Sequence, residues 1–241
     1  MQSIPYNFND MTRVHWMGIT ILEPVTVLTN LLITAVCLFA FIRLRRLNAP
    51  NTIQKIMEYF FLLMGIATAT GGILGHGFLY ITGLYGKIPG WYISMFAIAF
   101  IERAAIIHSR PLMGSKLGNF FSLLNYVEVA VFMVLAFITL NFRFVEIHAT
   151  YGLFIIVFCF ELYTYSKVKD PGSRYIFVAT LLAAIAAISN LLELSIHRWF
   201  TYNDLSHVFM AVAIYCYYKG AMNLKIYKNS EPNKVKAATI T

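Results

Sequence analysis

Long apolar runs separated by short polar segments dominate the chain. Seven of these runs are long enough to cross about 30 Å of hydrocarbon as α-helices. Turn-forming residues at 48–51 and 170–172 separate neighbouring runs. The pattern predicts an all-α polytopic membrane protein with a bundle of seven transmembrane helices. The predicted spans are approximately 18–42, 56–82, 91–109, 120–141, 146–166, 173–197 and 204–225.

Basic residues set the expected orientation of these spans. Thirteen Lys and Arg residues follow the odd-numbered spans, and four lie in the segments on the other side. Because cytoplasmic loops are enriched in Lys and Arg, we predict that the N-terminus lies outside and the C-terminus in the cytoplasm. We expect one membrane domain, residues 1–228, and a short basic cytoplasmic tail, residues 229–241.

Composition agrees with a membrane location. The chain is 59% apolar and 12% charged, whereas a soluble domain carries about 25% charged residues. The net charge of +8 does not indicate a nucleic-acid partner, because the basic residues lie in the loops between apolar runs. We therefore expect membrane lipid as the partner and a bacterial inner (plasma) membrane as the location.

Polar and titratable side chains gather in the segment 190–207, which covers the end of the sixth span, a brief loop and the start of the seventh span. Membrane segments seldom carry so many such groups at one depth without a use. The predicted topology puts this segment on the outer side, together with His76 near the end of the second span. A stripe of three residues at helical spacing is expected to face the bundle interior. The stripe is Asn190, Glu193 and His197, and it is followed by Asn203, Asp204 and His207.

These residues allow two interpretations. Histidines and a carboxylate that converge from separate helices form a zinc or similar divalent-metal site. His76, Asp204 and His207 would be its ligands, and Glu193 or Glu23 would orient or deprotonate water. Accessory residues would be Asn203, His197 and Asn190.

The second interpretation is structural. Asn203 or Asp204 would cap the last helix. Glu23, which precedes Pro24, would begin the first helix. His197 and His207 would be interfacial side chains with one polar end in water. Both interpretations remain open from the sequence.

Charged residues also lie deep within the apolar runs. Glu102, Arg103 and Glu128 fall near the middle of their spans, and Glu161 falls in the inner half of the fifth span. A lone charge at that depth costs about 2.5–3.5 kcal/mol on insertion scales. We therefore expect a buried ion pair of Arg103 with Glu128 or Glu161, acting as a structural clamp between helices.

A histidine late in the second span and an Asp/His group opening the seventh resemble the CREST superfamily of alkaline ceramidases and progestin/adiponectin-type receptors. The resemblance implies seven helices and a zinc ion on the side of the membrane where the N-terminus lies. His76 corresponds to the helix-two ligand, and His207 to the second residue of a His-x-x-x-His pair. The segments 22–30 and 203–207 also resemble an uncharacterised bacterial membrane family.

The resemblance has clear departures. Asn203 stands at the first histidine of the pair, Gly72 stands at a serine position, and no Asp occurs near the start of the third span. Either Asp204, His197 or Glu193 completes an altered site, or the branch has lost its metal. The expected function is a metal-dependent hydrolase of a lipid amide or ester. The alternative is a non-enzymatic receptor, small-ligand binder or structural subunit of a membrane complex.

Overall fold

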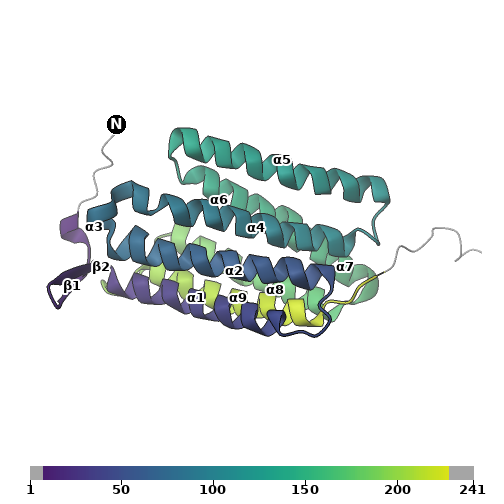
Figure 1. The fold of residues 1–241 in the computed structure, drawn as a ribbon, viewed down its shortest axis with the longest axis horizontal. Coiled ribbons are helices and arrows are strands. Elements are labelled where there is room, and N and C mark those ends of the chain that lie inside the picture. The colour runs from purple at the N-terminus through teal and green to yellow at the C-terminus, as the bar shows by residue number, and fades with distance from the viewer. Residues whose placement is uncertain (1–7, 228–241) are drawn as a thin grey trace, which may run out of the picture.

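A computed structural model describes residues 8–227 as a bundle of long helices with a small β-hairpin at one end (Figure 1). The predicted tail, 229–241, lies outside the described residues. The elements are η1 Phe8–Asp10, β1 Arg13–Trp16, β2 Ile19–Leu22, α1 Pro24–Arg45, α2 Thr52–Gly72, η2 Ile73–Gly77, α3 Leu79–Thr82, η3 Gly83–Gly86, α4 Ile88–Ser109, α5 Ser115–Thr139, α6 Arg143–Thr150, η4 Tyr151–Phe158, α7 Cys159–Val168, α8 Pro171–Leu191 and α9 Tyr202–Asn223.

Six helices of the described chain are long and apolar enough to cross a membrane. The chain therefore has the character of an integral membrane protein. α9 has a similar length of 22 residues but is not among the six, since it carries Asn203, Asp204, His207 and Lys219 along its length. The six are Pro24–Arg45, Thr52–Gly77, Ile88–Ser109, Ser115–Thr139, Arg143–Val168 and Pro171–Leu191.

Local sequence explains where the helices begin. Asn51 and Gln54 form a reciprocal capping box at the start of α2, with bonds of 2.9 and 3.0 Å between the side chain of each and the backbone N–H of the other. Asp170 caps α8 by accepting the amide N–H of Ser173 at 2.8 Å, and Pro171 occupies the first helical position. The turn predicted at 48–51 is thus confirmed, whereas only Asp170 of the turn predicted at 170–172 lies outside a helix, because α8 already begins at Pro171.

Two predicted span boundaries are wrong. Residues 18–22 do not belong to the first helix, because Ile19–Leu22 pairs with Arg13–Trp16 as an antiparallel hairpin. The sixth helix ends at Leu191 rather than at residue 197. Glu193 takes a left-handed backbone conformation with φ of 50°, and the chain then forms a loop with a single β-bridge between His197 and Phe200.

Small residues and large apolar side chains fill the interior. Ala97, Ala179 and Ala213 are fully buried, and their short side chains let the helices approach closely. α5 lies at one side of the bundle beside α4 and α6 (Figure 1). Its outward face exposes apolar side chains such as Phe137 (69%) and Ile138 (72%), as expected of a helix surrounded by lipid.

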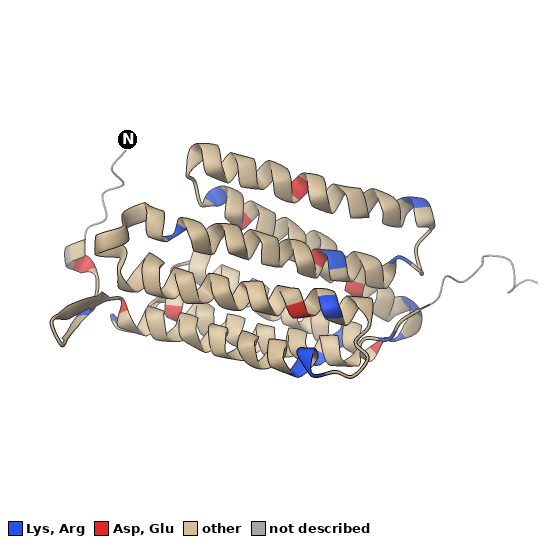
Figure 2. Cartoon of the chain, viewed as in Figure 1, with Lys and Arg blue, Asp and Glu red and all other residues tan. Residues whose placement is uncertain are grey.

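Charged residues are distributed unevenly along the bundle. Figure 2 shows Lys and Arg concentrated at the end where α1 finishes and α2 begins, and fewer of them at the hairpin end. Several Asp and Glu residues instead lie part-way along the helices. These buried acids must be paired or hydrogen-bonded, and they locate the polar clusters described below.

Candidate functional site

The first turns of α1 present polar groups to the bundle interior. Thr26, Thr29 and Asn30 are only 2%, 8% and 5% exposed, and their helical spacing puts them on one face. The Thr29 hydroxyl and the Asn30 amide both donate to the carbonyl of Thr26, at 3.1 and 2.9 Å. Glu23, just before the helix, takes a left-handed conformation with φ of 43°, which is uncommon for a residue with a side chain.

His76 reaches this face from the end of α2. It lies in η2, a π-helical turn of the kind often found at functional sites. Nδ1 of His76 lies 2.8 Å from Oε2 of Glu23. A Cβ atom at Gly72 would lie 2.6 Å from Cβ of Asn30. Glycine at this position therefore permits the close approach of α2 to α1 that brings His76 to Glu23.

α9 contributes the third part of the site. Thr201 and Asp204 form a capping box, in which Oδ2 of Asp204 accepts the amide N–H of Thr201 at 2.6 Å and its hydroxyl at 3.0 Å. Asp204 is 1% exposed. About one turn later, Nδ1 of His207 lies 3.0 Å from Oγ1 of Thr29 and 3.4 Å from Nδ2 of Asn30. The start of α9 is thereby held against α1.

The rings of His76 and His207, which we name the outer histidine pair after the predicted topology, lie edge to face, with centroids 6.5 Å apart and an interplanar angle of 85°. The Thr29 hydroxyl can accept Nδ1–H of His207 or donate to Nδ1, whereas the amide nitrogen of Asn30 can only donate to it. Within residues 8–227, neither Nε2 atom makes a hydrogen bond. An imidazole fixed through Nδ1–H presents a lone pair at Nε2, the arrangement of a metal-ligating histidine.

The charge state of Glu23 follows from its neighbours. Burial raises the pKa of Glu23, but the hydrogen bond from His76 and the electrostatic interactions with His76, Lys87 and His207 together outweigh burial and leave the pKa lowered. Glu23 is therefore ionised at neutral pH. Burial in turn lowers the pKa of Lys87, and the charge of Glu23 only partly offsets this effect. The groups around the outer histidine pair thus form a compact network with one ionised carboxylate.

The remaining residues predicted for this site divide into two groups. Asn190, at the end of α8, donates to Oδ1 of Asn203 at 3.0 Å, so these two amides link α8 to α9. Glu193 and His197 are exposed in the loop that follows α8. The prediction that they share an interior stripe with Asn190 is wrong, because the helix that would create the stripe ends at Leu191.

The predicted ligand set is not assembled as a unit. Within the described part of the chain, the only group of three metal-ligating residues whose ligand atoms lie within 4.8 Å of one another is Glu102, Glu128 and His148. Asp204 does not join the outer histidine pair as a third ligand, since its carboxylate is engaged at the start of α9. Asp204 takes the capping role that the structural interpretation allowed.

The predicted ion pair of Arg103 is also wrong. Nη1 of Arg103 donates to the carbonyl of Ser122 at 3.1 Å, and the guanidinium lies 5.0 Å from the ring centroid of Tyr126. Glu128 and Glu161 are hydrogen-bonded to histidines instead. An apolar environment requires each charge to find a partner, but it does not determine which one.

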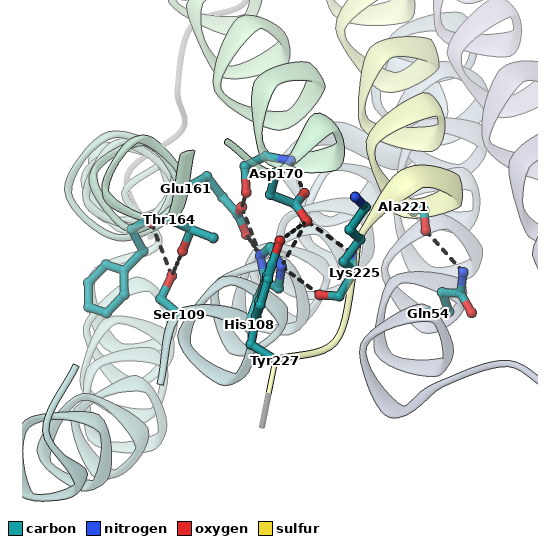
Figure 3. Close-up of polar contacts among 11 residues, drawn as sticks. Gln54, His108, Ser109, Glu161, Thr164, Asp170, Ala221, Lys225 and Tyr227 are labelled. Atoms are coloured by element: carbon teal, nitrogen blue, oxygen red, sulfur yellow. Dashed lines mark hydrogen bonds and ion pairs between the residues drawn. The ribbon is translucent and has the colours of Figure 1, made fainter. Parts of the chain in front are cut away.

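A second polar network joins the opposite end of the bundle (Figure 3). Nδ1 of His108 lies 3.0 Å from Oε2 of Glu161, and Nε2 lies 3.1 Å from the carbonyl of Lys225. Asp170 accepts the hydroxyl of Tyr227 at 2.7 Å and the amide N–H of Lys225 at 3.1 Å. Among the described residues, no buried side-chain atom of this network lacks a hydrogen-bond partner. We call it the inner network after the predicted topology, and it ties the segment after α9 to the turn before α8.

A comparison of the sequence with known families gives one match. Residues 25–226 match the model of a family described as "Family of unknown function (DUF6962)". The match covers all six apolar helices and α9. No curated protein and no solved structure was found to match the chain.

Proposed function

Because the chain belongs to DUF6962, a family of unknown function, we propose its activity from the geometry of the outer histidine pair. We propose that His76 and His207 hold a divalent metal ion, with zinc as the first choice. We further propose that the protein hydrolyses an amide or ester bond of a membrane lipid. The resemblance of the His76 and His207 positions to ceramidase-like proteins of the CREST superfamily suggests this reaction.

The topology proposed for this function has seven crossings, with α9 as the seventh. Its support is the length of α9 and its close packing against α8 and α1. Basic residues favour the end where α1 finishes (Figure 2), which we assign to the cytoplasm. The outer histidine pair then lies at the outer face of a bacterial inner membrane, at headgroup depth, where a lipid headgroup has access to it.

One observation carries the metal proposal. Both histidines are tied through Nδ1 to α1 or its cap, His76 to Glu23 and His207 to Thr29. Nε2 of His76 is then left with a lone pair, and Nε2 of His207 has one when its ring hydrogen is on Nδ1; the two rings are nearly perpendicular, with centroids 6.5 Å apart. A carboxylate that holds the distal N–H of a ligating histidine raises its basicity and fixes its orientation. The residues therefore fit a two-histidine site, with further positions open to substrate and water.

The chemistry is divided between the ion and the protein. A divalent ion at this place would supply Lewis-acid activation of a carbonyl group and of water. Glu23 orients His76 and contributes the negative charge that favours a cation. Thr29 and Asn30 orient His207. Asp204 does not bind the ion but positions His207 indirectly, by fixing the start of α9. The exposed Glu193 has no assigned role.

Metal analysis of the protein purified in detergent tests the proposal. We expect bound zinc in the wild type, and we expect His76→Ala and His207→Ala each to hold one equivalent less than the wild type. His197→Ala is the matched control, because this histidine is exposed in the neighbouring loop and should leave metal content unchanged. Glu23→Gln should weaken zinc affinity by about 10–100-fold, as is usual when a carboxylate partner of a ligand is removed.

The non-enzymatic alternative has one observation in its favour. Asp204 is the carboxylate nearest His207 in sequence, but it accepts hydrogen bonds in the capping box. The histidine pair therefore lacks a preformed third ligand. The outer end would then be a hydrogen-bonded plug in a receptor, a small-ligand binder or a subunit of a membrane complex. Absence of metal at neutral pH, with an unfolding temperature unaffected by chelators, would favour this alternative over the hydrolase.

A further inference from the structure

A second cluster of titratable groups lies in the middle of the bundle, between α4, α5 and α6. Glu102 comes from α4, Glu128 from α5 and His148 from α6, and the three are 0%, 8% and 0% exposed. Each offers one ligand atom to a group in which all such atoms lie within 4.8 Å of one another. We call these residues the central cluster. It is separate from the outer histidine pair and shares no residue with it.

Hydrogen bonding fixes the orientation of His148. Its Nε2 lies 3.0 Å from the carbonyl of Met95, which can only accept, so Nε2 carries a hydrogen. Its Nδ1 then faces Glu128, at 2.7 Å from Oε1 and 2.9 Å from Oε2. If the His148 ring were neutral, the lone pair on Nδ1 would point at the ionised carboxylate of Glu128, and the two would repel each other. At this spacing the positive species between them is a proton, and a metal cation that binds both groups would replace that proton and move Nδ1 and the carboxylate apart.

Glu102 supplies the independent evidence for a ligand. Its Oε1 atom is buried and has no hydrogen-bond partner within the described residues. Its Oε2 accepts from the amide of Asn125 at 3.3 Å, which holds the carboxylate in place. A Cβ atom at Gly152 would lie 2.4 Å from Oε1, so the glycine of the π-helical segment η4 leaves this oxygen its space. A buried carboxylate oxygen without a partner is rare and calls for an explanation.

We propose that the central cluster is a divalent-metal site with Glu102, Glu128 and His148 as ligands. Two carboxylates and a neutral imidazole carry a charge of about −2, which one divalent cation neutralises in a region where net charge is costly. Two ligands have outer partners, since Asn125 holds Glu102 and the Met95 carbonyl holds His148. Two oxygens and one nitrogen suit Mn²⁺, Fe²⁺ or Zn²⁺ rather than a metal that prefers sulfur.

The test measures metal content in variants of similar shape. Protein purified in detergent is loaded with Mn²⁺ or Zn²⁺, freed of excess by gel filtration and analysed for bound metal. Glu102→Gln, Glu128→Gln and His148→Gln should each lose one equivalent. Glu58→Gln is the matched control, because Glu58 is also buried in a span but pairs with Arg45 at 2.8 Å. Both Glu58→Gln and His76→Ala should keep the metal of the central cluster.

Thermal unfolding gives a second measure, which compares the wild type with a variant that folds. We expect a chelator to lower the unfolding temperature of the wild type and to have a smaller effect on folded Glu102→Gln, because metal bound to the native state stabilises it. Wild-type protein with no metal beyond that removed by His76→Ala would overturn the proposal. The proposal would also be overturned if the three substitutions left the metal content unchanged, since the central cluster would then hold protons and no metal.

Discussion

Asp204→Ala separates the two roles open to this carboxylate, the cap of α9 and a metal ligand. Asp204 accepts the amide N–H and the hydroxyl of Thr201 at 2.6 and 3.0 Å and is 1% exposed. A lost cap costs about 1 kcal/mol, and a lost hydrogen bond to a charged group costs about 1.5–3 kcal/mol. We therefore expect Asp204→Ala to lower the free energy of unfolding by about 2–4 kcal/mol and to leave metal content unchanged.

Hydrogen exchange read by mass spectrometry over residues 199–208, together with unfolding in mixed micelles, measures these effects. Thr201→Ala is the control, because it removes the partner and leaves the carboxylate. In the double variant, the combined loss should be smaller than the sum of the single losses, since both residues serve one cap. Unchanged exchange at the start of α9, or loss of bound metal with the cap intact, would refute the capping role.

Three further predictions concern packing, the inner network and pH. Gly72→Ala should destabilise the protein by about 1–3 kcal/mol, measured by unfolding in micelles, because its Cβ would meet Asn30 at 2.6 Å. Asp170→Ala should speed proteolysis after α9 while Asp170→Asn does so less, since the segment is held by bonds to the Asp170 carboxylate. The lowered pKa of Glu23 means that its stabilisation is present above its unfolded pKa and is lost as pH falls through the lower folded pKa. The wild type should therefore be more stable than Glu23→Gln above the unfolded pKa of Glu23, and this difference should disappear as pH falls through the folded pKa, so that the free energy of unfolding of Glu23→Gln varies less with pH over this range.

The apolar helices could be predicted because hydrophobicity and length act locally. Runs of apolar residues between turn sequences mark six long helices in nearly their observed places. The boundaries failed where local backbone chemistry competes with hydropathy. Residues 19–22 are apolar enough to extend the first helix, yet they form a β-strand. Leu192, Leu194 and Ile196 resemble a continued helix, but the left-handed conformation of Glu193 interrupts it.

The candidate site could be predicted in part because depth along a helix can be counted from the sequence. His76 and His207 fall at one depth, and the structure brings their rings together. Rotation about each helix axis depends on packing, which a single sequence does not reveal. Arg103 therefore bonds to a carbonyl on α5 rather than to an acid, and the bonds of Glu128 and Glu161 to His148 and His108 were missed.

One signal for those bonds was present in the sequence. Each Glu within an apolar span requires a hydrogen-bond donor, and histidines in neighbouring apolar runs lie at a similar depth in the predicted membrane. Arg103 was the obvious donor because its charge is fixed, whereas a histidine gains its charge from the partner itself. The inner network adds a contact that no span pattern predicts, since Asp170 binds Tyr227 from beyond the last helix (Figure 3).

X-ray absorption at the zinc edge tests most directly whether the outer histidine pair holds a metal. The measurement uses Glu102→Gln protein with one equivalent of zinc, so that the central cluster does not contribute. We expect two imidazole ligands at about 2.0–2.1 Å, and their loss when His76 and His207 are both replaced by alanine. A zinc environment without imidazole, or one that the double substitution leaves unchanged, would contradict the proposed site.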